Sequence, residues 1–140
     1  MALTDQPYLP LFVDDWMNNN KLKICSPASH GLLISIMCLM HKSNTYGKLL
    51  LKQKFKQQAK QEFKQTVKRV HEFACQVAKQ TSFDLPDVVL LLEELLEEEV
   101  IFIEGDYLIN KRMVRDAEIS HQRRIAGARG GYATHHKQSF

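Results

Sequence analysis

A helix followed at once by a hairpin, in the second half of the chain, constrains the fold most. Residues 82–100 carry apolar side chains at helical spacing, with Ser82 or Asp84 as a candidate N-cap and Pro86 in the first turn. The apolar positions are Leu85, Val88, Val89, Leu92, Leu95 and Leu96. Two short apolar stretches joined around Gly105 and Asp106 follow directly, which is typical of a tight β-hairpin.

Two more helices and a short strand are predicted upstream of this unit. Ser26 as N-cap and Pro27 at the first helical position open a segment whose residues 32–40 are apolar on nearly every side. This pattern predicts a helix buried between other elements. Residues 48–51 suit a small strand. From about residue 55 to 78 apolar side chains recur every three or four positions, which predicts a long amphipathic helix. They are Phe55, Ala59, Phe63, Val67, Val70, Ala74 and Val77.

Charge is sorted along the chain, although its net value is only +3. The long helix carries lysines at every fourth position, which form a basic ridge: Lys56, Lys60, Lys64 and Lys68. The next helix is acidic, and its expected outward positions have no compensating base: Glu93, Glu94, Glu97, Glu98 and Glu99. From Lys111 to Phe140 there are seven bases and two acids. The sequence therefore predicts two basic segments that flank an acidic helix.

The stretch SHQRRIAGARGG, residues 120–131, crowds arginines and glycines together. It does not follow a strand, and no Gly-Lys-Ser/Thr completes a phosphate-binding loop, so a nucleotide site is not indicated. We expect Gly127 or Gly130 to end the helix that carries Arg123 and Arg124, because glycine adopts the left-handed conformation of a helix C-cap without steric cost. Gly130 and Gly131 would then form a hinge.

The order of helix, strand, helix, helix and hairpin predicts a mainly α fold with a small β-hairpin, in the α+β class. We expect a winged-helix-like domain over residues 1–110. A basic C-terminal helix over residues 111–131 would end at the glycine hinge, and residues 132–140 would form a flexible tail or the start of a linker. The alternative is a helical bundle in which the hairpin packs as a lid. A chain of 140 residues is the size of one domain with a tail.

Four stretches between Tyr8 and Gly131 resemble the N-terminal domain of phage and prophage replication-initiation, or replisome-organiser, proteins. They are YLPLFVDDWM, GLLISIMCLMHKS, LLEELLEEEVIFIEGDYLINKRMVRDAEIS and RRIAGARGG. The resemblance implies a winged helix with a role in DNA replication, followed by a separate region that recruits host helicase machinery. That region is not within these residues, so we expect a fragment or a stand-alone relative. The Lys/Gln-rich insert at residues 52–80 departs from many relatives.

These observations predict a non-enzymatic module for DNA binding or replisome assembly. DNA would be contacted mainly at its phosphates, without sequence preference, and host or phage replication proteins are further expected partners. The expected phosphate contacts are Lys56, Lys60, Lys64, Lys68, Arg112, Arg115, Arg123, Arg124 and Arg129. Phosphates would repel the acidic helix, so we expect it to face solvent or a protein. The alternative function is a protein interaction module, as an adaptor or in a homo-oligomer, without direct DNA binding.

Other classes of function find little support in the residues. His71 and Cys75 lie one helical turn apart, but no third and fourth metal ligand is evident, and no GxSxG turn positions a nucleophile. We expect no cofactor and no catalysis. Asp14 and Asp15 stand near Phe12 and Trp16 and are expected to anchor the N-terminal segment. Three cysteines without a CxxC pair, and no apolar run of membrane-spanning length, predict a cytoplasmic protein with reduced thiols.

Overall fold

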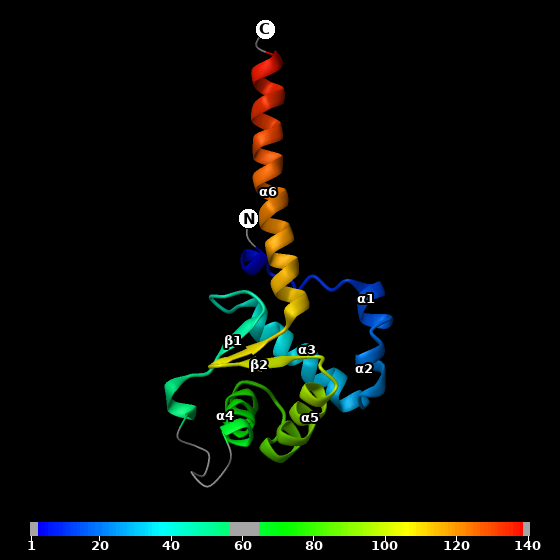
Figure 1. Ribbon diagram of the computed structural model, residues 1–140, viewed down its shortest axis with the longest axis vertical. Helices are drawn as coiled ribbons and strands as arrows, with labels where there is room; N and C mark the ends of the chain where they lie inside the picture. Colours follow the sequence, from blue (N-terminus) through cyan, green and yellow to red (C-terminus); the bar gives the residue numbers. More distant parts are fainter. Residues whose placement is uncertain (1–2, 57–64, 139–140) are drawn as a thin grey trace.

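The computed structural model of the chain describes the backbone of residues 3–56 and 65–138, and the side chains of residues 3–56 and 67–128. Figure 1 shows the arrangement of the elements. In chain order they are η1 (Leu3–Asp5), α1 (Val13–Met17), α2 (Asn20–Ile24), α3 (Pro27–His41), β1 (Lys48–Leu50), η2 (Gln53–Phe55), α4 (Gln65–Gln80), α5 (Leu85–Glu97), β2 (Phe102–Glu104), β3 (Tyr107–Ile109) and α6 (Lys111–Gln138). The predicted mainly helical fold with a small antiparallel sheet is confirmed.

The three strands form one antiparallel sheet in the order β1-β3-β2. Leu108 in the central strand faces Leu49 of β1 and Ile103 of β2. The hairpin between β2 and β3 turns at Gly105, whose φ of 59° is a conformation that glycine adopts readily. The hairpin predicted around Gly105 and Asp106 is therefore confirmed, and a third strand, near the predicted residues 48–51, completes the sheet.

The core lies among α3, α4, α5 and the sheet. Residues 32–40 of α3 supply several buried side chains, which confirms the predicted buried helix, and Ser26 caps it by accepting a hydrogen bond from the amide of Ser29. From the other elements the largest fully buried apolar side chains include Phe73, Leu92, Leu95 and Leu108. The predicted α5 stripe and residues Val70, Ala74 and Val77 of the α4 stripe thus meet α3 in one apolar cluster, whereas Val67, predicted in the same stripe, is 50% exposed.

The long helix was predicted to begin at about Phe55, and this prediction is wrong. Phe55 lies in the short 3-10 helix η2, is 8% exposed and packs into the core, whereas α4 is described from Gln65. Gln76 of α4 explains why Phe55 lies outside this helix. Its amide accepts a 2.7 Å hydrogen bond from the Lys52 N–H and donates a 3.0 Å bond to the Leu50 carbonyl. The backbone after β1 is thus bound alongside α4 instead of extending it. Ala59 and Phe63 lie outside the described residues.

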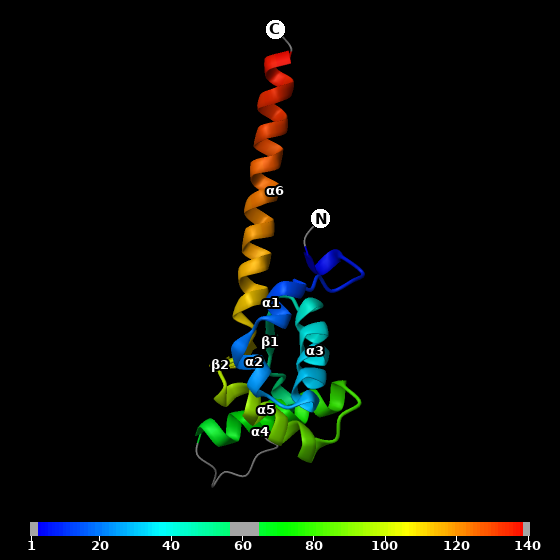
Figure 2. The ribbon, with the colours of Figure 1, turned by 90° about the vertical axis from the view of Figure 1, so that its right-hand side faces the viewer.

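The C-terminal helix does not stop at the glycines. α6 runs from Lys111 to Gln138 and passes through Gly127, Gly130 and Gly131, so the predicted helix end, hinge and separate tail after residue 131 are wrong. Glycine inside a helix costs only about 1 kcal/mol relative to alanine. The neighbouring alanines and arginines are good helix formers and offset that cost. Figures 1 and 2 show α6 extending from the body as a single helix.

Substitution of Gly127 tests whether α6 continues through its glycines. A Cβ added at Gly127 would meet no atom within 4 Å, so Gly127→Ala removes backbone entropy without a clash. We expect the variant to stabilise α6 by about 1 kcal/mol. Circular dichroism during heating should show more helix, lost at a higher temperature. If Gly127 instead ended the helix in a left-handed conformation, alanine would lower the helix content.

Candidate nucleic-acid interface

The N-terminal end of α6, here called its root, is fixed by Asn110 to the rest of the domain, here called the body. Asn110 is 7% exposed. Its N–H donates a 2.9 Å hydrogen bond to the Gly47 carbonyl, and its Oδ1 accepts a 3.1 Å bond from the Met113 N–H as a helix N-cap. Gly47 has a φ of 83°, and a Cβ there would lie 2.7 Å from the Val114 nitrogen. Only glycine lets β1 approach α6 this closely, so these contacts set the direction in which α6 leaves the body.

Beyond this root α6 projects into solvent. Residues 121–128 are all exposed, whereas Met113 near the start of the helix is buried. At a rise of about 1.5 Å per residue, a helix of 28 residues is roughly 40 Å long. No acidic residue follows Glu118 in the sequence. The projecting part of α6 is therefore a polar helix of positive charge.

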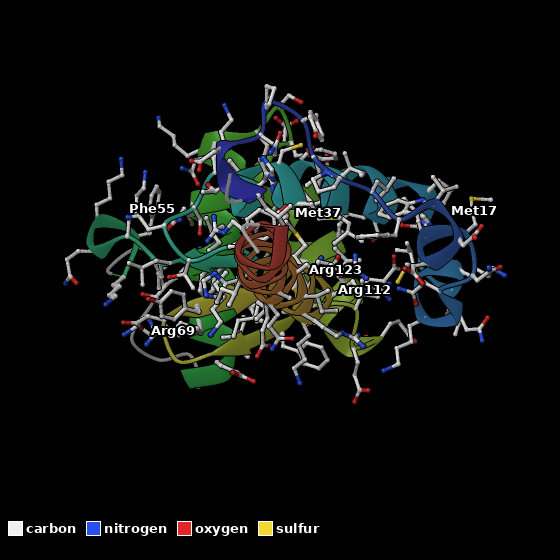
Figure 3. All side chains as sticks on the ribbon, turned by 90° about the horizontal axis from the view of Figure 1, so that it is seen from above. Met17, Met37, Phe55, Arg69, Arg112 and Arg123 are labelled. Carbon is white, nitrogen blue, oxygen red and sulfur yellow. The ribbon has the colours of Figure 1, made fainter. Side chains whose placement is uncertain are left out.

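Arg123 and Arg124 lie on this projecting part. Both are exposed, and the Arg124 guanidinium is 3.0 Å from Nδ1 of His121, one turn earlier. Figure 3, which looks along α6, shows Arg123 on the same side of the helix as Arg112. Arg129 lies on the same helix, and its side chain is outside the described part. The structure thus brings the predicted arginines onto one continuous element.

Arg112 is engaged within the protein at the root of α6. Its guanidinium forms ion pairs with Asp15 of α1 and, at 3.5 Å, with Asp116, and it lies 5.7 Å from the centre of the Phe12 ring. The predicted anchoring of the N-terminal segment is confirmed for Asp15 and Phe12. A phosphate at Arg112 would have to displace Asp15. Arg115 is exposed and forms no ion pair among the described residues.

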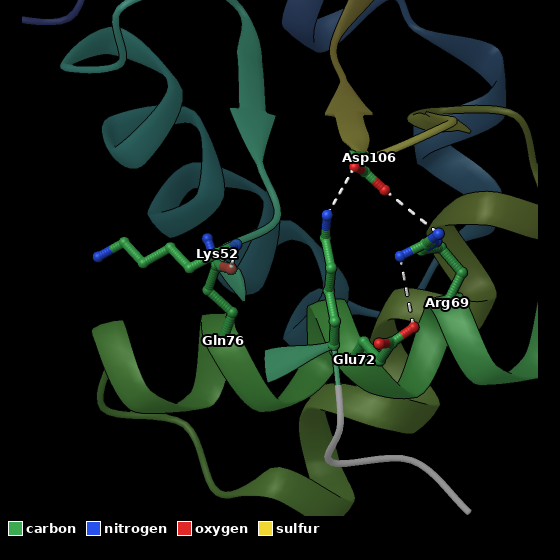
Figure 4. Close-up of polar contacts among 6 residues, drawn as sticks. Lys52, Arg69, Glu72, Gln76 and Asp106 are labelled. Atoms are coloured by element: carbon green, nitrogen blue, oxygen red, sulfur yellow. Dashed lines mark hydrogen bonds and ion pairs between the residues drawn. The ribbon is translucent and has the colours of Figure 1, made fainter. Parts of the chain in front are cut away.

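The predicted lysine ridge is not one helical face. Lys56 lies outside α4, and its ammonium group forms a 2.8 Å ion pair with Asp106 in the hairpin turn. Asp106 also binds Arg69 at 3.2 Å, and Arg69 reaches the buried Glu72 at 3.5 Å (Figure 4). The hydrogen bond from Lys56 lowers the pKa of Asp106. Lys68 is half-buried on α4, and Lys60 and Lys64 lie outside the described residues. Lys56 therefore joins η2 to the hairpin.

The acidic helix α5 presents only part of its charge to solvent. Glu94 turns inward and accepts hydrogen bonds from the Ser26 amide at 2.8 Å, from the Ser26 hydroxyl at 3.0 Å and from the Ser29 hydroxyl. These bonds, that from Ser29 above all, lower the pKa of Glu94. Glu99 forms a 3.1 Å ion pair with Lys21. The prediction of five uncompensated outward glutamates is therefore wrong for these two, because α3 and α2 supply partners that spacing cannot reveal.

Because of Glu94, the free energy of unfolding should depend on pH. Because its folded pKa lies below its ordinary value of 4.5, its contribution is complete above that pH and is lost as the pH falls through the lowered value. We expect Glu94→Gln to lower the free energy of unfolding at about pH 7, with a difference from wild type that shrinks toward about pH 3. Urea unfolding at both pH values measures this. Glu93→Gln is the control, and equal behaviour of the two variants would contradict the assignment.

A cavity of about 820 Å³ lies at the root of α6, between the N-terminal segment and β2. Its lining mixes apolar and charged side chains, among them Trp16, Met37, Phe102 and Arg112. Among the described side chains, those of residues 3–56 and 67–128, no group of three or more His, Cys, Asp and Glu is placed to hold a metal ion. In the same part of the chain, every helix is too short or too polar to cross a membrane.

The fold and this site together define a mainly helical domain with a small antiparallel sheet and a projecting basic helix. The chain matches no protein-family model, no curated protein and no solved structure. Function must therefore be argued from the geometry of α6 and its surroundings.

Proposed function

We propose that this chain is a non-enzymatic DNA-binding module of a phage-type replication initiator, and that it contacts phosphates through α6. The observation that carries the proposal is the projecting part of α6, which is exposed on all sides over residues 121–128 and carries Arg123, Arg124 and Arg129 with no acid after Glu118. Short isolated polar helices are marginal in water. A polyanion that neutralises the arginines would stabilise this helix, which supports nucleic acid as the ligand.

The positions of the arginines on α6 suit a DNA groove. Arg123 and Arg124 are consecutive, so their directions differ by about 100° around the helix. The major groove of B-DNA admits an α-helix, with a phosphate backbone on either side. A helix lying in it would direct one arginine toward each backbone. Such contacts fix position without reading sequence, in keeping with binding that has no sequence preference.

The order of the elements supports a winged-helix assignment. The segment α3-β1-α4-α5-β2-β3, with strand order β1-β3-β2, follows the helix, strand, helix, helix and wing order of that class. In that class α5 would be the helix that enters the groove. Here α5 exposes Glu93 and Glu97, and the hairpin exposes Glu104, whereas Asp106 is paired with Lys56 and Arg69. Phosphates would repel both, so we assign DNA contact to α6, with cytoplasmic replication proteins as further partners.

Titration of a fluorescent duplex and of a single strand with the full chain tests the proposal. About four phosphate contacts would reduce the affinity for duplex roughly 10²-fold between 50 and 200 mM salt. A protein that binds neither nucleic acid at low ionic strength would refute the proposed function.

A further inference from the structure

The outward side of α5 is an acidic face with an apolar centre. Leu90 is 67% exposed, and Glu93 and Glu97 follow it at helical spacing on the same side, with Asp87 one turn before it. None of these three acids has an ion pair among the described residues. We call Asp87, Leu90, Glu93 and Glu97 the acidic face. An exposed leucine between unpaired acids is typical of a surface that receives a basic partner with an apolar centre.

The outward side of α6 has the opposite pattern. Arg115, Ile119 and Arg123 recur at every fourth position and therefore share one side of the helix. Ile119 is 38% exposed, and neither arginine has an ion pair among the described residues. We call these three residues the basic face. Its order of base, apolar residue and base complements the order of acid, leucine and acid on α5.

The two faces cannot meet within one molecule. Figures 1 and 2 show α5 at the end of the body opposite to the end from which α6 projects. We propose that the basic face of one copy docks on the acidic face of a second copy, with Ile119 against Leu90 and the arginines beside the acids. Nucleic acid is a poor occupant of the acidic face, because its phosphates would be repelled there.

This contact joins different surfaces of the two copies and therefore leaves one face of each kind unoccupied. A heterologous contact of this type continues into an open chain unless its rotation closes a ring. The inference does not rest on DNA binding, because the acidic face takes no part in the proposed phosphate contacts. Arg123 of the basic face belongs to both contacts, so DNA and a second copy would compete for it. Association should weaken with added salt, since the charges on both faces are exposed.

Two charge-reversal variants, without nucleic acid, test the proposal. Glu93→Lys with Glu97→Lys removes the acidic face, and Arg115→Glu with Arg123→Glu removes the basic face. In sedimentation equilibrium at low salt, the wild-type mass should rise with concentration beyond that of a dimer. Each variant alone should remain a monomer, with a dissociation constant raised at least about tenfold. Their mixture should associate again and grow like the wild type, because the intact faces of the two variants complement each other and so do the two reversed faces.

Glu104→Lys is the matched control, since Glu104 is an exposed acid on the hairpin, away from both faces. It should associate like wild type. A wild-type chain that stays monomeric up to millimolar concentration overturns the proposal, as does a mixture of the two variants that forms no complex. Duplex titration of Glu93→Lys with Glu97→Lys separates the two functions: wild-type or tighter binding is expected. If this variant lost as much affinity for DNA as it lost for a second copy, the acidic face would also serve DNA binding. That result would overturn the proposal of a separate self-association contact.

Discussion

Replacing Arg123, Arg124 and Arg129 with alanine is expected to weaken binding to a short DNA duplex roughly 10²- to 10³-fold near 0.1 M salt. Each phosphate that a basic residue neutralises releases counterions and adds about 0.9 to the slope of log affinity against log salt. Three lost contacts therefore remove a large share of the binding free energy. Fluorescence anisotropy with a duplex of about two helical turns measures the effect.

A matched triple variant controls for net charge in this experiment. Lys23, Lys42 and Lys79 are exposed on other elements, so their replacement with alanine removes the same charge without touching α6. This variant should lose far less affinity than the arginine variant. Equal losses would mean that binding depends on overall charge, and the assignment of α6 as the interface would fail.

Phe73→Ala is expected to destabilise the fold by about 3–5 kcal/mol. Phe73 is fully buried, belongs to α4 and is one of the largest side chains of the core that α3, α4 and α5 share. At about 3 °C per kcal/mol for a chain of this size, the melting temperature should fall by roughly 10–17 °C. Val67→Ala is the control on the same helix, because Val67 is 50% exposed and should cost less than about 1 kcal/mol. Similar losses for both variants would contradict the packing of α4 described above.

Elements with local signals could be predicted from the sequence. The Ser26 cap and Pro27 fix the start of α3, and its apolar run fixes its burial. Gly105 and Asp106 mark the hairpin, because a tight turn needs residues that tolerate unusual backbone angles. In each case the physical cause lies within a few residues of the feature, so periodicity and turn chemistry suffice.

Features that depend on distant residues were beyond such reasoning. The path of the chain from β1 into η2, alongside α4, depends on Gln76, a fully buried amide that binds the backbone of Leu50 and Lys52. A polar residue on a helix carries no signal that it will be buried. Glu94 turns inward for the same kind of reason, since its partners Ser26 and Ser29 are far away in the sequence.

The sequence indicated which arginines lie on the C-terminal helix, but not how far that helix extends. Charge counting located Arg123 and Arg124 on a C-terminal helix, whereas the preference of glycine for helix ends misplaced the end of α6. The engagement of Lys56 by Asp106 and of Arg112 by Asp15 reflects tertiary contacts. These two predicted phosphate ligands therefore have internal partners that only the fold reveals.

The salt dependence of duplex affinity tests the central claim most directly. Affinities of the wild type and of the variant with alanine at Arg123, Arg124 and Arg129 would be measured over a range of salt concentrations. We predict that the slope of log affinity against log salt is steep for the wild type and shallower by about 3 for the variant. Equal slopes, or an affinity of the wild type that does not change with salt, would contradict the assignment of α6 as a phosphate-binding helix.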